Sequence, residues 1–140
     1  MTQSTGYAIT ALGHVAAVGE RPLLIKEIAA ATGLPHPYLA KIIHTLARRG
    51  LVVTRRGVGG GVHLARPAAE VTLYDIAEAL DDPLLDERCM LGAAVCSDER
   101  ACPAHEFWSQ HREAQIAFLR ESTLADVAEF ERRQLERSAA

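Results

Sequence analysis

The sequence predicts a mainly α-helical protein with one small β-hairpin, and three observations support this prediction. Apolar residues recur at helical spacing through three segments of the first fifty residues. Two short apolar runs, 51–55 and 62–66, flank the glycine-rich stretch RGVGGG, a pattern typical of a hairpin. Helix-capping signals mark the segments that follow. A chain of 140 residues is long enough for one small domain and an appended helical arm.

Three helices are predicted before the hairpin, over residues 4–18, 23–33 and 38–50. The stretches GERP and LPHP separate them, because glycine and proline interrupt helices. In the first helix an apolar stripe is formed by Tyr7, Ala8, Ala11, Leu12, Val15 and Ala16. In the third helix the apolar face is formed by Leu39, Ile42, Ile43 and Leu46, and the opposite face by Lys41, His44, Thr45 and Arg48. We expect the apolar faces to lie in a common core.

Three more helices are predicted after the hairpin. Thr72 and Asp75 form a capping-box pattern at the start of a short helix. Pro103 is expected to open a long helix, which ends shortly before Thr123. Thr123 and Asp126 are expected to cap a final helix that extends into the charged tail.

Helix, tight turn, helix and glycine-tipped hairpin, in this order, are the pattern of a winged helix-turn-helix, a fold that binds DNA. The charge distribution agrees with this interpretation. Residues 1–66 contain eight Lys or Arg and two Asp or Glu, a net charge of +6, whereas residues 67–140 contain seven Arg and sixteen Asp or Glu, a net charge of −9. Only the first half is therefore suited to a polyanion. The residues expected to contact double-stranded DNA are His36, Tyr38, Lys41, Thr45 and Arg48 on the second helix of the pair, and Arg55, Arg56, Gly59 and Gly60 on the wing.

Several other functional classes are not favoured by the sequence. The stretch GVGGGV lacks the third glycine of a dinucleotide-binding GxGxxG motif and lies between strands rather than before a helix. No nucleophile–base pair, phosphate loop or catalytic carboxylate pair is evident, so neither an enzyme nor a small-molecule substrate is expected. No apolar run approaches the length of a membrane span, and MTQSTGYAIT lacks the basic start of a secretory signal. We therefore expect a cytoplasmic protein without a membrane partner.

All three cysteines and one nearby histidine lie in CMLGAAVCSDERACPAHEFW, residues 89–108. Cys89 and Cys102 would lie about 140° apart on one helix, so a loop is needed to bring all the thiols together. Three thiolates and an imidazole can hold zinc or an iron–sulfur cluster. The thiols can also act as free redox groups beside Arg88 and Arg100, or be inert. No C-x-x-C pair is present, which argues against a zinc ribbon or a thioredoxin-like site. The spacing alone leaves the remaining alternatives open.

Nearly the whole chain resembles the IscR/NsrR group of winged-helix iron–sulfur transcriptional regulators. The motifs that carry the resemblance are, in order, GYAITALGHVA, LIKEIAAATGLPHPYLAKIIHTLARRGLV, RGVGGGVHLARP, VTLYDIAEAL, the spacing C-x6-C-x5-C, and TLADV. The stretch CPAHEFW is similar to the IscR branch, in which a histidine completes a [2Fe–2S] site. In the nitric-oxide-sensing branch an acidic residue of the first helix is the fourth ligand, and Gly6 stands at that position here. The resemblance therefore implies an iron–sulfur cluster, [2Fe–2S] with [4Fe–4S] as the alternative, whose ligands are Cys89, Cys96, Cys102 and His105.

The resemblance also implies how the chain is organised. It implies a winged DNA-binding domain over residues 1–80, a cluster-binding loop over 81–102, and a dimerisation helix with a C-terminal helix over 103–140. The aromatic residues Phe107, Trp108 and Phe118 are expected to form the apolar seam of the dimerisation helix. A homodimer is expected to bind a two-fold-related DNA operator.

The resemblance further implies that the cluster controls operator binding in response to iron, cluster supply, oxidants or nitric oxide. The IscR branch has a glutamate where this chain has Ala40 and a glutamine where it has Lys41, so operator preference does not carry over. The alternative hypothesis is a cluster-free regulator of the same fold that senses cysteine oxidation or a protein partner. A third is a zinc-stabilised DNA-binding module.

Overall fold

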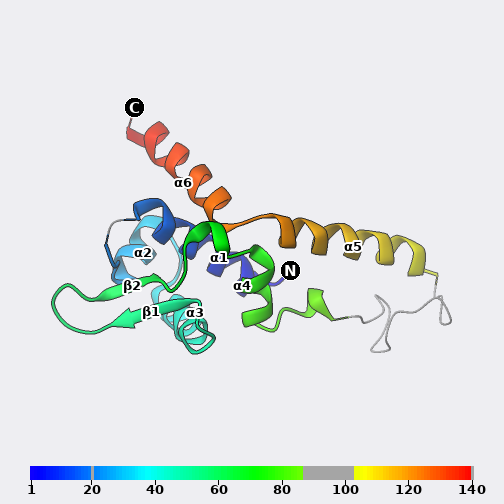
Figure 1. The fold of residues 1–140 in the computed structure, drawn as a ribbon, viewed down its shortest axis with the longest axis horizontal. Coiled ribbons are helices and arrows are strands. Elements are labelled where there is room, and N and C mark those ends of the chain that lie inside the picture. Colours follow the sequence, from blue (N-terminus) through cyan, green and yellow to red (C-terminus); the bar gives the residue numbers. More distant parts are fainter. Residues whose placement is uncertain (20, 87–102, 140) are drawn as a thin grey trace.

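The computed structural model describes residues 1–19, 21–86 and 103–139 and is mainly helical with one antiparallel hairpin, which confirms the predicted fold class (Figure 1). The α-helices in the described residues are α1 (Gln3–Val18), α2 (Ile25–Thr32), α3 (His36–Arg48), α4 (Leu73–Ala79), α5 (His105–Glu121) and α6 (Leu124–Ala139). The strands are β1 (Val52–Arg55) and β2 (Gly61–Leu64), and two short 3-10 helices are η1 (Ala68–Glu70) and η2 (Pro83–Leu85). None of these helices is long and apolar enough to cross a lipid bilayer.

The first three helices and the hairpin share one hydrophobic core with α4, Leu119 of α5 and Leu124 of α6. Most of the apolar stripe predicted for the first helix is buried, and so is the apolar face of the third; the buried side chains are Ala8, Ala11, Leu12, Val15, Ala16, Leu39, Ile42, Ile43 and Leu46. Gly33 follows α2 in the left-handed conformation, with a φ of 76°, and starts the tight turn into α3. Pro37 lies in the first turn of α3, where a backbone N–H has no acceptor within the helix, so the lack of an N–H in proline breaks no helical hydrogen bond. The helix-turn-helix is thus confirmed, with α3 beginning at His36, two residues before the predicted start.

The hairpin forms the predicted wing. Arg55 pairs with Gly61 where β1 and β2 meet the loop, and Gly57 and Gly59 turn that loop with φ angles of 90° and 78°. Along β2, Val62 exchanges two backbone hydrogen bonds, of 3.0 and 2.7 Å, with Leu23 in the segment between α1 and α2. This isolated bridge, which the sequence does not indicate, anchors the wing to the segment between α1 and α2.

Helices α4 and α6 start side by side although they lie far apart in the sequence. Both predicted capping boxes are confirmed, each with two reciprocal hydrogen bonds, between Thr72 and Asp75 and between Thr123 and Asp126. The backbone N–H of Leu73 donates to the Ser122 carbonyl at 3.0 Å, and the N–H of Leu124 donates to the Val71 carbonyl at 2.9 Å. The two helices also begin with one shared pattern, T-L-x-D-[IV]-A-E. The end of α5 is therefore fixed to the start of α4.

The last helix packs against the first. Gly13 marks the closest approach, because a Cβ at this position would collide with Cγ1 of Val127. Arg132 donates from Nε to the Ala17 carbonyl and from Nη2 to the Ala16 carbonyl, both at 3.2 Å. Carbonyls in the last turn of a helix lack intrahelical donors and carry the negative end of its dipole, so a guanidinium is a favourable partner. Helix α6 thus packs on α1 and does not continue the direction of α5 (Figure 1).

Helix α5 projects from the rest of the molecule as an arm (Figure 1). It begins at His105, two residues after the predicted start, because Pro103 and Ala104 form a turn and the Ala104 carbonyl accepts the first helical hydrogen bond. On this arm Leu119 is buried, whereas Phe107 and Phe118 are 64% and 61% exposed. Two of the three aromatic residues expected to form an apolar seam are therefore uncovered in a single chain.

Candidate DNA-binding surface and the support of the cysteine segment

The outward face of α3 presents polar residues that the sequence singles out. His36, Lys41 and Arg48 are exposed, and Thr45 is half-buried with its hydroxyl donating to the Lys41 carbonyl at 3.2 Å. No acidic side chain lies in the first turn of α3, so the positive end of the helix dipole is unopposed there. This face is chemically suited to phosphates and base edges alike.

Tyr38 has a different environment from the other residues predicted on α3. Its ring meets that of Tyr7 edge to face, with 5.5 Å between the ring centroids, and its hydroxyl is hydrogen-bonded to that of Ser4. Both partners belong to α1, and 37% of Tyr38 remains exposed. The side chain therefore ties the first turn of the recognition helix to the first two turns of α1, which sequence reasoning did not foresee.

The predicted wing residues occupy the loop and its approach. Arg55 and Arg56 are exposed. A Cβ at Gly60 would collide with the carbonyl oxygen of Arg55, so a side chain at this position would open the hairpin. Gly59 takes the left-handed conformation that the loop requires. Val58, at the tip, is fully exposed and was not among the predicted contacts, although its place among the glycines of RGVGGG is a usable signal.

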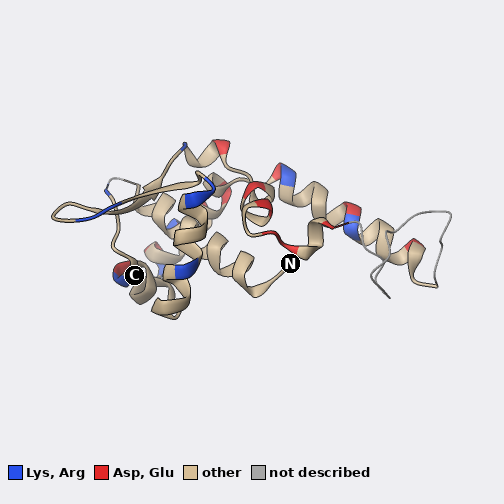
Figure 2. Ribbon diagram, turned by 90° about the horizontal axis from the view of Figure 1, so that it is seen from below, with Lys and Arg blue, Asp and Glu red and all other residues tan. Residues whose placement is uncertain are grey.

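Lysine and arginine gather at the end of the molecule that carries the wing, whereas α5 carries both signs of charge (Figure 2). Figure 2 shows Lys and Arg on the wing and the helices beside it, and Asp and Glu around α4 and the segment that follows it. The residue after α3, Arg49, is absent from the predicted set and forms an exposed ion pair of 3.2 Å with Asp81. The basic end therefore coincides with α3 and the wing, and it would attract a polyanion.

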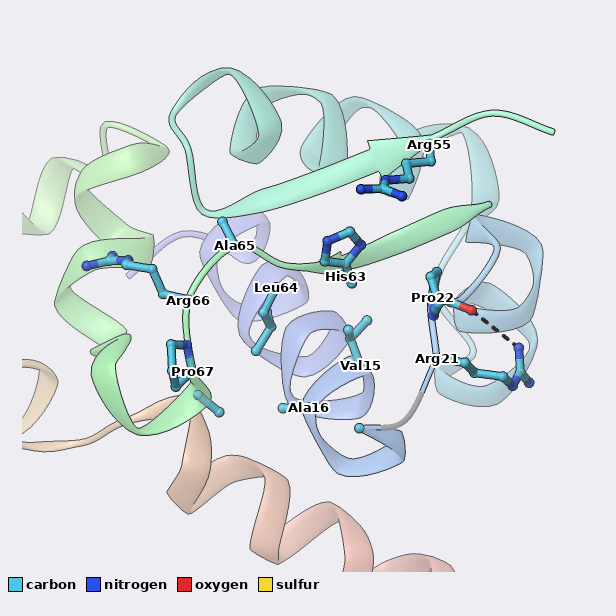
Figure 3. A pocket seen from close by; sticks show the side chains of 12 residues that line it. Val15, Ala16, Arg21, Pro22, Arg55, His63, Leu64, Ala65, Arg66 and Pro67 are labelled. Carbon is cyan, nitrogen blue, oxygen red and sulfur yellow. Dashed lines mark hydrogen bonds between the residues drawn. The ribbon is translucent and has the colours of Figure 1, made fainter. Parts of the chain in front are cut away.

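A cavity of about 680 Å³ lies beside the wing, between β2 and the carboxyl end of α1 (Figure 3). Its lining includes Arg21, Arg55, Arg66 and His63, and Nδ1 of His63 is buried without a hydrogen-bond partner among the described residues. Glu27 holds Arg21 at 2.9 Å and Asp75 holds Arg66 at 3.7 Å, and both guanidinium groups point away from the cavity in Figure 3. Within the described part of the chain Arg55 has no ion-pair partner, so this wing cation is available to a phosphate.

The candidate cluster ligands are only partly placed. Cys89, Cys96 and Cys102 lie outside the described residues, and their convergence stays a prediction. His105 is described, as the half-buried first residue of α5. The four side chains are nonetheless a chemically suitable donor set, because iron–sulfur irons take thiolates and in some sites imidazole. The described residues on either side show how the segment is supported.

A buried carboxylate, Asp82, anchors the chain shortly before the cysteines. Its Oδ2 accepts hydrogen bonds from the Thr2 N–H at 2.8 Å and the Thr5 hydroxyl at 2.7 Å, and its Oδ1 accepts one from the Leu84 N–H at 2.9 Å. The residue is 2% exposed. Burial raises the pKa of the Asp82 carboxyl, but the three hydrogen bonds together outweigh it and hold the pKa below its usual value. Asp82 therefore stays ionised and fixes this segment to the start of α1.

The arm helix holds the same segment from the other side. Arg112 donates from Nε to the Asp86 carbonyl at 2.9 Å and from Nη2 to the Leu85 carbonyl at 2.8 Å. About two turns further along α5, the Arg120 guanidinium lies 4.0 Å from the centroid of the Tyr74 ring of α4. The residues just before the cysteine segment are therefore bonded to α5 as well as to α1.

Comparison with known proteins agrees with this architecture. Residues 1–129 match the Rrf2 family, described as iron-dependent transcriptional regulators. The chain is 31% identical to the transcriptional regulator IscR of Serratia proteamaculans over 91% of this chain and 77% of that protein. It superposes on CymR, the global cysteine regulator of B. subtilis, with a TM-score of 0.77 and 29% identity, over 93% of this chain and 96% of that one. With IscR of T. potens the TM-score is 0.72 and the identity 26%, over 94% and 87% of the two chains.

A winged helix-turn-helix with a basic recognition face and a helical arm defines a DNA-binding transcriptional regulator rather than an enzyme. The chain belongs to the Rrf2 family of such regulators. The family assignment confirms the resemblance drawn from the motifs.

Proposed function

We propose that this regulator reads a DNA operator through α3 and the wing. The first turns of α3 enter the major groove with His36 and Lys41 nearest the base edges, while Thr45 and Arg48 follow on the same face. Arg55 and Arg56 meet the flanking phosphates or the minor groove, next to Gly59 and Gly60. The observation that supports this proposal is the exposed basic face of α3 beside a wing arginine that no described acidic residue neutralises.

We further propose that two copies pair through α5, so that two recognition helices face two related half-sites. The exposed side chains of Phe107 and Phe118 support this proposal. So does a cavity of about 340 Å³ along α5 that Leu84, His111 and Phe118 help to line. Sedimentation of the Phe118→Glu variant tests the pairing, with Phe130→Glu on α6 as the matched control. The first substitution is expected to yield monomers and the second to leave dimers; dimers in both would contradict this interface.

Operator binding is controlled, in our proposal, by an iron–sulfur cluster held by Cys89, Cys96, Cys102 and His105. A bound cluster would supply one-electron redox chemistry and a metal-mediated link among these four side chains. The position of His105 supports the assignment, because it follows Cys102 closely and begins the arm helix. Similarity to proteins named IscR supports it as well. The division into residues 1–80, 81–102 and 103–140 belongs to the same proposal.

A second candidate is a regulator of the same fold without a cluster, which senses cysteine oxidation or a protein partner. The superposition on CymR, named a global cysteine regulator, favours this candidate. Iron and acid-labile sulfide per chain, measured after purification without oxygen, separate the two. The first candidate predicts about two of each for a [2Fe–2S] centre, with visible absorption bands. A colourless protein without iron that still selects its promoter would favour the second.

Matched histidine variants sharpen this test. His105→Ala is expected to lower the iron content or shift the visible bands, because it removes a proposed ligand. His111→Ala, on the same helix, removes a ring that stacks on Phe107 and is expected to leave both unchanged. Gel shifts with cluster-bound and cluster-free protein then measure the control itself. Equal operator affinity in the two states would contradict cluster control while leaving DNA binding in place.

A further inference from the structure

A continuous set of contacts links the arm helix to the reading end of α3. It starts at Arg112, whose guanidinium holds the Leu85 and Asp86 carbonyls at 2.8 and 2.9 Å. Just before these two residues, the Leu84 N–H donates to Asp82 Oδ1 at 2.9 Å. Pro83 lies between Asp82 and Leu84 and begins η2, so the backbone between these two residues has little freedom. The residues that Arg112 holds are therefore separated from Asp82 by only Pro83 and Leu84.

From Asp82 the contacts continue into α1. Its Oδ2 accepts from the Thr2 N–H and the Thr5 hydroxyl, 2.8 and 2.7 Å away, and both donors belong to the cap and first turn of α1. Asp82 and Thr5 are 2% and 0% exposed. Hydrogen bonds to a charged, buried acceptor are among the stronger ones in proteins, because water does not compete for them. The first turn of α1 is thus fixed to the segment that Arg112 holds.

The last contact joins α1 to α3. Ser4 lies beside Thr5 in the first turn of α1, and its hydroxyl is hydrogen-bonded to that of Tyr38. The Tyr38 ring also rests edge-on against Tyr7. Tyr38 belongs to the first turn of α3, the part of a recognition helix that lies nearest the bases. The contacts therefore end at the element whose position decides which bases are read.

We propose that Arg112, Asp82, Ser4 and Tyr38 form a polar relay that sets the position of the α3 first turn relative to the arm helix. This inference rests on the proposed function and names the residues that carry regulation into the DNA-binding surface. Arg112, Asp82 and Ser4 act as positioning residues, since they lie outside the proposed DNA contacts. A rival route runs from α5 through α4, where Arg120 lies over Tyr74. The relay depends on Arg112 and the rival route on Arg120, so substituting each arginine separately distinguishes the two routes.

A double-mutant cycle on affinity for the protein's own promoter tests the relay. Arg112→Met keeps an unbranched apolar side chain and removes the guanidinium donors, and Ser4→Ala removes the hydroxyl that contacts Tyr38. Each substitution is expected to weaken binding about 3- to 10-fold. The double variant is expected to lose no more affinity than the single variant that binds more poorly. Independent sites would instead give the product of the two losses, and that result would overturn the relay. Arg120→Met is the matched control and is expected to bind within about 2-fold of the unaltered protein; a loss equal to that of Arg112→Met would assign the coupling to α4.

Amide exchange supplies a readout that needs neither DNA nor a cluster. In Arg112→Met the amides of Leu39 and Ala40, in the first turns of α3, are expected to exchange at least about threefold faster. Arg120→Met should leave them unchanged. Unaltered exchange in Arg112→Met, with the fold intact by circular dichroism, would overturn the proposal. Failure of cluster control would give a different result. The unaltered protein would then bind its operator equally well with and without iron and sulfide, while the combined loss in the double variant would still be smaller than the product of the two single losses.

Discussion

The packing of α6 on α1 depends on the absence of a side chain at residue 13. A Cβ there would overlap Cγ1 of Val127 and lie 3.3 Å from its Cβ, so Gly13→Ala forces the two helices apart. Overpacking of this kind costs about 1–3 kcal/mol. Replacing a helical glycine with alanine also stabilises the folded state by up to about 1 kcal/mol through backbone entropy, which offsets part of the loss.

Gly6 on the same helix separates the two effects. A Cβ at this position has no other atom within 4 Å, so Gly6→Ala should gain stability from helix propensity without a clash. The difference between the two variants therefore isolates the cost of the α1–α6 contact, about 1–3 kcal/mol with Gly13→Ala the less stable. For a chain of this size that corresponds to a separation of roughly 3–12 °C in Tm.

Thermal and urea unfolding, followed by circular dichroism, measure this separation. Limited proteolysis at the arginines of α6 adds a local readout, because a displaced helix is cut before the rest of the chain unfolds. If Gly13→Ala melted at or above Gly6→Ala and α6 stayed protected, the close packing of the two helices would be refuted.

Three further predictions concern single side chains. Asp82→Asn is expected to cost about 1–3 kcal/mol near neutral pH. Because the folded-state pKa of Asp82 is lowered, this penalty should be full above the unfolded-state pKa and vanish as pH falls through the folded-state pKa, which urea unfolding at neutral pH and at successively more acidic pH would reveal. Arg132→Met should cost about 1 kcal/mol by freeing the last carbonyls of α1, whereas its exposed neighbour Arg133→Met should be neutral in the same melts. Arg55→Met should reduce the slope of log affinity against log salt by about one, and a slope equal to that of Arg133→Met would remove Arg55 from the DNA contacts.

Local patterns in the sequence were sufficient for most of the secondary structure. The apolar spacing of Leu39, Ile42, Ile43 and Leu46 predicts a buried helix face, and these four side chains are buried. The capping boxes depend only on residues three apart, and both are present. Such features could be predicted because the interactions that form them lie within one or two turns of the chain.

Long-range polar contacts could not be predicted in this way. Asp82 reads as one acidic residue in a charged loop, and its role depends on Thr5, 77 residues away in the chain. Tyr38 reads as an outward residue of α3, and it is exposed, but its contacts with Tyr7 and Ser4 of α1 could not be foreseen. The start of α5 at His105 depends on the turn at Pro103, where helix signals are accurate only to within a residue or two. Each of these features needs the tertiary structure, which no local pattern contains.

The paired starts of α4 and α6 have a consequence for how such chains diverge. The backbone N–H of Leu124 donates to the Val71 carbonyl, so the starts of α4 and α6 are held together by a contact that does not involve the segment between α4 and α5. Lengthening a flexible connection costs little, only about 0.6 kcal/mol of closure entropy for each doubling of its length. A change of one residue in length between two cysteines is therefore expected to leave the starts of α4 and α6 in register. We therefore expect the spacing of the cysteines to tolerate change while α3 and the wing keep their positions.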